Sequence, residues 1–256
     1  YTNLQASFVG PHVLQLPGNI DPTNNLVSKI ELGDPVNLRL TNGFTIEGWL
    51  YPRPRTDYVP EQVEQILFRG DSRDCLEPYY LGLERVADPA RMDIVFHVEG
   101  TTNHDCGVIL ETAKAPVRVG EWNHIAAVFE PNVRWVNTDG RVTPWPTNEL
   151  RLYTNATLLT VPNPELFLED PILGMVYTTF TGERPFGELD PSFSPGVSIG
   201  ARSRYDFSEP FRGDIDELSV YGRVLTDPEI AAIAARRNRG KADFTVSPPL
   251  SLAQLT

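Results

Sequence analysis

The sequence predicts an all-β protein with one short helix near its C-terminus. Short segments in which polar and apolar residues alternate recur along the 256 residues, and this period of two is the pattern of a half-buried β-strand. The chain also contains 23 prolines and 19 glycines, which is typical of a protein with many turns. Because 41% of the residues are hydrophobic, the chain can bury a sizeable core, and we expect one large domain.

The charge of the chain excludes one class of partner. The formal net charge is −12 and the isoelectric point is near 4.8, whereas nucleic-acid binding depends on clustered Lys and Arg. The basic cluster at 236–241 is explained by its position at the C-terminal end of the predicted helix. No apolar run approaches the roughly 18 residues of a membrane span. The chain begins at Tyr1 rather than Met, and we expect a processed or excised mature chain.

Strands are expected wherever the alternation is clear and turn residues bound it. In chain order they are residues 8–16, 27–32, 44–51, 65–70, 79–86, 92–99, 121–129, 149–153, 157–161, 196–202 and 211–223.

The third of these strands is the clearest. Phe44, Ile46 and Leu50 fall on one face, and Trp49 and Tyr51 fall on the other. Because both faces carry large side chains, we expect a central strand with one face toward a second sheet and the other toward a groove.

The two cysteines favour an oxidising, secreted or cell-surface location. Cys75 and Cys106 stand just outside the two strands of a predicted hairpin, so folding brings them together at its open end. A disulfide closing this loop of about 30 residues would stabilise the fold by roughly 3 to 4 kcal/mol. The alternative is two buried thiols in a cytosolic protein.

Asn155 begins an Asn-Ala-Thr glycosylation sequence at a predicted turn. Whether this sequence is glycosylated depends on the host.

The segment that follows the last strand has the signals of a helix. Thr226 is a natural N-cap, and Glu229 falls at the N3 position of a capping box. The apolar run 230–235 forms the body, and Gly240 supplies the stop. Residues 241–256 then form an extended tail whose apolar residues require a partner.

Two long connections, 130–148 and 162–195, are expected to be binding loops or assembly surfaces. For the second, the alternative is a satellite core formed by its aromatic residues. Candidate ligand-binding residues, whose rings could stack on sugars, are Trp135, Trp145, Tyr177, Tyr205 and Phe207.

Five short segments in this order resemble the laminin G-like branch of the concanavalin A-like lectin/glucanase superfamily. They are FTIEGW at 44–49, GEWNHIA at 120–126, LRLY at 150–153, SIGAR at 198–202, and FRGDIDELSVY at 211–221 with RVLT and EI after it. The resemblance covers roughly residues 8–237. It implies a jelly-roll sandwich of two antiparallel sheets over residues 1–240, followed by the tail 241–256.

The resemblance also implies a structural calcium ion. Its usual carboxylate is the Asp of the Ile-Asp-Glu step, here Asp216, with Asp214 nearby and backbone carbonyls from the N-terminal strands. Such hard oxygen ligands suit Ca²⁺. The alternative is that Asp214 and Asp216 cap turns or pair with Arg212 and Arg223.

No catalytic motif is convincing, and we expect a protein that is not an enzyme. Ser198 lies in a Gly-x-Ser-x-Gly pattern, but a loop follows it and all four histidines precede it, unlike the hydrolase arrangement. Related glucanases carry Glu-x-Asp-x-x-Glu on one strand, which Asp214-Ile215-Asp216-Glu217 only imitates. His124 is expected to be a packed histidine.

Two functions remain. The first is a non-catalytic extracellular binding or adhesion module that recognises a glycan or a protein through its rim loops. The second is a structural subunit of an extracellular filament or surface layer, in which terminal strands and the tail join identical subunits by edge-strand pairing.

Overall fold

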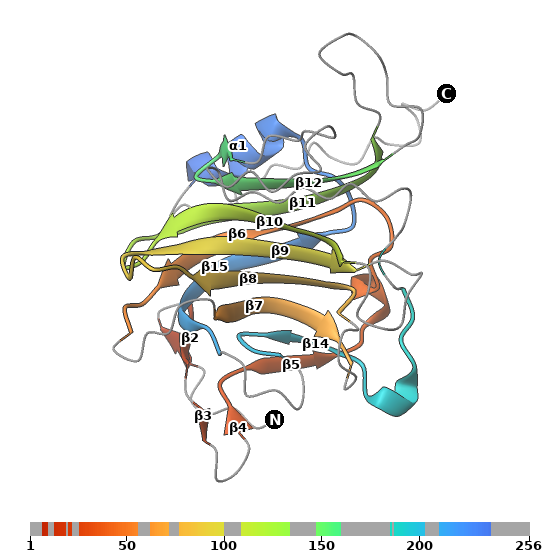
Figure 1. Ribbon diagram of the computed structural model, residues 1–256, viewed down its shortest axis with the longest axis horizontal. Coiled ribbons are helices and arrows are strands. Elements are labelled where there is room, and N and C mark those ends of the chain that lie inside the picture. Colours follow the sequence, from red (N-terminus) through yellow and green to blue (C-terminus); the bar gives the residue numbers. More distant parts are fainter. Residues whose placement is uncertain are drawn as a thin grey trace, which may run out of the picture.

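The computed structural model describes residues 7–9, 13–18, 20–21, 26–55, 62–71, 77–99, 109–133, 147–159, 185, 187–202 and 210–236. Over these residues the protein is a sandwich of two antiparallel sheets with one α-helix (Figure 1). The all-β class, the two sheets and the single helix are therefore confirmed. The boundary between a domain and a tail at residue 240 lies outside the described residues and stays a prediction.

The first sheet has seven strands. In spatial order they are β1 (Ser7–Val9), β2 (Val13–Pro17), β15 (Arg212–Tyr221), β6 (Phe44–Pro52), β11 (Asn123–Val133), β12 (Thr147–Thr154) and β13 (Thr157–Leu158). The last long strand of the chain, β15, thus lies between an N-terminal strand and the clearest predicted strand, and it pairs antiparallel with both.

The second sheet has six strands. In spatial order they are β10 (Ile109–Arg118), β9 (Arg91–Glu99), β8 (Tyr79–Arg85), β7 (Val63–Gly70), β14 (Gly196–Ile199) and β5 (Ile30–Gly33). A small hairpin, β3 (Ile20–Asp21) and β4 (Leu26–Val27), and two 3-10 helices, η1 (Val36–Leu38) and η2 (Pro191–Phe193), complete the described elements.

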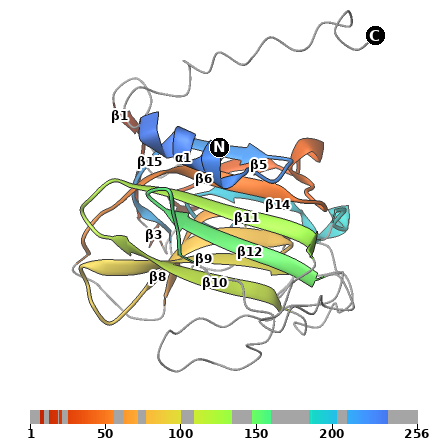
Figure 2. The same ribbon diagram turned by 90° about the horizontal axis from the view of Figure 1, so that it is seen from above.

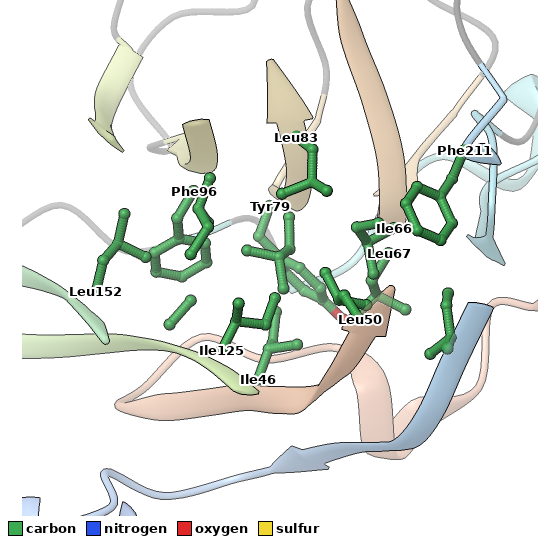
Figure 3. Packing of buried hydrophobic residues seen from close by; sticks show 14 of the residues in the cluster. Ile46, Leu50, Ile66, Leu67, Tyr79, Leu83, Phe96, Ile125, Leu152 and Phe211 are labelled. Carbon is green, nitrogen blue, oxygen red and sulfur yellow. The ribbon is translucent and has the colours of Figure 1, made fainter. Parts of the chain in front are cut away.

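The core fills the space between the sheets (Figure 3). Phe44, Ile46 and Leu50 are fully buried there, as the alternation of this strand predicts. The ring of Phe44 lies 5.2 Å from that of Tyr79 and 5.5 Å from that of Phe129, centroid to centroid. Aromatic side chains from both sheets therefore meet at the centre of the sandwich.

Strand β10 was not expected from the sequence. It carries Pro116, which cannot donate a hydrogen bond and argues against a central strand. However, β10 lies at the edge of its sheet and pairs only with β9, and an edge strand tolerates proline.

The helix α1 (Asp227–Arg236) packs on the outer face of the seven-stranded sheet (Figures 1 and 2). Its buried residues Ile230 and Ile233 form a second apolar cluster with Ala126, Val128 and Tyr153 of the sheet, among others. The predicted capping box is present, because the backbone N–H of Thr226 donates to Oε2 of Glu229 at 2.8 Å. These contacts hold α1 in place on the outer face of the seven-stranded sheet.

Candidate functional site

A groove of about 1000 Å³ lies between α1 and the outer face of the seven-stranded sheet. Three strands of the sheet, the turns before β11 and between β12 and β13, and one side of the helix contribute to its walls. The described residues that line it are Val13, Trp49, Trp122, Asn155, Ala156, Asp216, Ala231, Ala234 and Ala235.

The strand register brings the floor of the groove together. Asp216 of β15 is directly opposite Trp49 of β6 on one side and opposite Val13 of β2 on the other. Cross-strand partners project from the same face of a sheet, so three neighbouring strands place these side chains in a row. Trp49 therefore faces a groove while its neighbour Leu50 is buried in the core, which confirms the expectation for this strand.

A buried polar group lies beside Trp49 on the same face of the sheet. The Nε2 atom of His124 lies 3.2 Å from Oε2 of Glu47, and neither side chain is exposed. The hydroxyl of Tyr221 donates to Oε1 of the same glutamate at 3.2 Å. Burial and the neighbouring Glu47 together raise the pKa of Tyr221 to about 12. The ring of His124 contacts the ring of Trp49 at 5.2 Å, so it is a packed histidine, as expected.

An exposed tryptophan at the groove packs against a half-buried tyrosine. Trp122 is 42% exposed, and its ring lies 5.6 Å from that of Tyr51. Asn155 lies in the turn between β12 and β13, where its Oδ1 accepts a hydrogen bond from the backbone N–H of His124 at 3.0 Å. The turn that carries the glycosylation sequence is thereby tied to the floor of the groove.

The helix side of the groove is lined by alanines alone among the described residues. Their small side chains leave space between the helix and the sheet. The result is a cleft lined by two indole rings, a carboxylate and an amide. This arrangement suits a ligand that has both apolar faces and hydroxyl groups.

The two predicted calcium ligands have different surroundings. Asp214 forms an ion pair with Arg53, whose Nη2 donates to both carboxylate oxygens at 2.8 and 2.9 Å, rather than with Arg212 or Arg223. Asp216 is the only carboxylate among the described residues that line the groove. Because Ca²⁺ takes six to eight oxygen ligands, a calcium site at Asp216 would need backbone carbonyls and water, and it stays a prediction.

A different set of side chains could hold a metal ion. Glu77, His97 and Glu99 each offer one ligand atom within 4.8 Å of the other two. Burial lowers the pKa of His97 to about 4, while burial and then Asp71 raise the pKa of Glu99 to about 7. The sequence signal for this set was the His-Val-Glu step at 97–99, which puts two ligand types on one face of a strand.

The remaining candidates from the sequence lie outside the described residues. They are Cys75, Cys106, Trp135, Trp145, Tyr177, Tyr205, Phe207 and the tail 241–256. Ser198, in contrast, is described and buried, and its hydroxyl donates to the backbone carbonyl of Ala201.

Comparison with known proteins identifies the superfamily of the chain. A laminin G family model, described as the concanavalin A-like lectin/glucanases superfamily, matches residues 24–160, which is more than half of the chain. The chain belongs to this superfamily. The resemblance of the five segments is thereby confirmed. A search of curated proteins found no relative by sequence.

Solved structures share the architecture at low sequence identity. A native heptameric SAP-like pentraxin from Limulus polyphemus is 13% identical, with a TM-score of 0.52 over 87% of this chain and 82% of the pentraxin. Trypanosoma rangeli sialidase in complex with sialic acid is 10% identical, with a TM-score of 0.51 over 92% of this chain and 29% of the sialidase. The ligand-binding domain of botulinum neurotoxin serotype D, in complex with N-acetylneuraminic acid, is 9% identical, with a TM-score of 0.50 over 91% of this chain and 44% of that chain.

These likenesses show a lectin-like fold. The chain spans less than half of the sialidase and toxin chains that it resembles. Within the described part of the chain, no helix has the length and apolar character needed to cross a membrane.

Proposed function

We propose that the protein is a non-catalytic, extracellular binding module of laminin G-like type that recognises a glycan in the groove beside α1. This site differs from the rim loops expected from the sequence, because its aromatic side chains come from β6 and from the residue just before β11. The single observation that carries the proposal is the exposed ring of Trp122 beside Tyr51, at the mouth of a groove floored by Trp49. Exposed aromatic rings next to hydrogen-bonding groups are typical of recognition surfaces.

The polar groups of the groove favour a neutral glycan. Asp216 lines the groove together with Asn155, and the described lining includes no Lys or Arg. A carboxylate accepts hydrogen bonds from sugar hydroxyls, but it repels an anion. Two of the similar structures are complexes with sialic acid or N-acetylneuraminic acid, which are anionic. The net charge of −12 also opposes such a ligand here, so we propose uncharged hexoses or N-acetylhexosamines.

The same lining supports binding without hydrolysis. A glycosidase generally places two carboxyl groups on either side of the bond that it cleaves. The described lining of the groove offers Asp216 alone, and the nearby Glu47 is fully buried. The groove can therefore hold a sugar by stacking and hydrogen bonding, without the acid and base that cleavage requires.

A glycan array probed with the full chain tests the proposal. We expect selective binding of neutral glycans, and we expect Trp122→Ala to reduce the affinity roughly two- to tenfold, because loss of a stacking ring removes roughly 0.5 to 1.5 kcal/mol. Asp216→Asn should weaken binding by removing a charge-assisted hydrogen bond.

Phe193→Ala provides the matched control. Phe193 is an aromatic residue, 36% exposed, on the 3-10 helix η2 rather than in the groove. Binding should survive this change. A Trp122→Ala variant that binds as tightly as the wild type would contradict the proposal, as would preferential binding of sialylated glycans.

A further inference from the structure

A second polar site lies on the other sheet. The core contains Ile94, Phe96 and Val98 of β9, so His97 and Glu99, at the alternate positions, point to the outer face of the six-stranded sheet. Glu77 lies two residues before the start of β8, the neighbouring strand. The three residues come together at the end of the sheet where β8 begins and β9 ends.

The ligand atoms of these three side chains are close enough to reach one ion after a small rearrangement. One ligand atom from each residue lies within 4.8 Å of the other two. Ligand atoms bound in tetrahedral geometry at the usual metal distance of about 2.0 to 2.2 Å lie about 3.3 to 3.6 Å apart. Side-chain rotations that bring the three atoms closer by at most about 1.5 Å would therefore place all of them within bonding distance of one ion.

His97 supplies an independent observation that points to a ligand. Its side chain is buried, with 7% exposure, and its Nε2 atom has no hydrogen-bond partner among the described residues. The ring is held in place by stacking on Tyr80, with centroids 4.7 Å apart and planes 11° from parallel. An unsatisfied buried nitrogen costs free energy, and bonding to a metal ion would satisfy the imidazole.

The two glutamates are also fixed, and each retains coordinating capacity. Glu99 is buried, and its Oε2 accepts a hydrogen bond from the backbone N–H of Glu77 at 2.7 Å. Glu77 pairs with Arg202 through Oε1, which leaves its second oxygen for another cation. Arg202 is itself positioned over the ring of Phe68, with its guanidinium carbon 5.1 Å from the centroid. A carboxylate offers about four lone-pair sites, so these contacts do not use up either group.

We propose that Glu77, His97 and Glu99 form a binding site for a divalent transition-metal ion of the zinc class. Imidazole nitrogen together with carboxylate oxygen suits Zn²⁺, whereas Ca²⁺ selects oxygen ligands alone. Three protein ligands leave a fourth position for water or for an acidic group of a partner. This site is distinct from Asp216 and from the groove beside α1, which lie on the other sheet.

Titration of the metal-free full chain with Zn²⁺ by isothermal calorimetry tests the site. We expect one equivalent per chain, at least tenfold weaker binding for His97→Gln, and a similar loss for Glu99→Gln. Asp93→Asn is the matched control, because Asp93 is a carboxylate on the same strand and the same face but outside the site. It should bind Zn²⁺ as the wild type does.

Two further measurements separate loss of the site from loss of the fold. Glu77→Gln changes a residue outside the strands and should weaken Zn²⁺ binding while the far-ultraviolet circular dichroism spectrum is unchanged. Co²⁺ bound to the wild type should give a visible absorption band that His97→Gln shifts or removes. The proposal is overturned if the wild type shows no saturable Zn²⁺ binding, if the His97 and Asp93 variants bind equally, or if Ca²⁺ binds more tightly than Zn²⁺.

Discussion

His124 and Glu47 are in direct contact beside Trp49 on the outer face of the seven-stranded sheet, with 3.2 Å between Nε2 and Oε2 and both side chains fully buried. Tyr221 donates to the second oxygen of Glu47, and Trp49 packs against the imidazole ring. The floor of the groove is therefore held by a buried polar group rather than by apolar contacts alone.

We predict that Glu47→Ala lowers the free energy of unfolding by about 3 to 5 kcal/mol, because removing one partner leaves the other buried and unsatisfied. Urea denaturation measures this change. Glu31→Ala is the control, since Glu31 also forms an ion pair, with Lys29, but its side chain is 51% exposed; this variant should lose no more than about 1 kcal/mol. Equal losses in the two variants would contradict a supporting role for the buried group.

A buried ionic network should make a similar contribution in the six-stranded sheet. Glu64 accepts from Arg85 at 2.9 Å, from Arg55 at 3.3 Å and from the backbone N–H of Arg212 at 2.8 Å. Arg85→Met should cost about 3 to 5 kcal/mol, because Glu64 stays buried with part of its charge uncompensated.

Arg91→Met serves as the comparison for Arg85→Met. The Arg91 side chain is 49% exposed and pairs with Asp93 at 3.1 Å, and the loss should stay within about 1 kcal/mol. Chemical denaturation of both variants measures the two losses in the free energy of unfolding. A loss for Arg85→Met no larger than for Arg91→Met would show that burial of this network does not contribute to stability.

The capping box at α1 predicts a pH-dependent contribution to stability. Hydrogen bonds from Arg223, and then from the backbone of Thr226, lower the pKa of Glu229 to about 2 from an ordinary value of 4.5. The folded state therefore binds this proton less tightly than the unfolded state. The stabilisation is present above about pH 4.5 and is lost as the pH falls toward 2.

Thermal denaturation of Glu229→Gln at several pH values measures this contribution. The variant should melt below the wild type at pH 7, and the difference should shrink between pH 4.5 and pH 2. Because the side chain is 40% exposed, the difference should be modest and reduced by salt. A difference that is the same at pH 7 and pH 2.5 would mean that the charge of Glu229 has no part in it.

Much of the fold follows from local patterns in the sequence. The alternation over 44–51 correctly predicts that Leu50 and Trp49 point to opposite faces of the strand. The pair Thr226 and Glu229 correctly predicts where the helix begins. Strand β10 was missed because it contains Pro116, which a strand tolerates only at the edge of a sheet. The edge position of β10 depends on the tertiary arrangement, which local patterns do not show.

The site was less accessible to sequence reasoning. Val13, Trp49 and Asp216 are neighbours only because β2, β15 and β6 pair in one particular register. Periodicity shows which face a residue takes, but not which strands become adjacent. For the same reason the sequence drew attention to Trp135 and Trp145 in a long connection, whereas the described groove uses Trp49 and Trp122.

The four tryptophans provide the most direct test of the proposed glycan site. Each indole N–H gives its own signal in a ¹⁵N-correlated NMR spectrum, and single Trp→Phe variants assign the signals. On titration with the neutral glycan that binds best on the array, the signals of Trp49 and Trp122 should shift and those of Trp135 and Trp145 should not. Shifts of Trp135 or Trp145 without any change at Trp49 and Trp122 would contradict the account and place the site in the long loop.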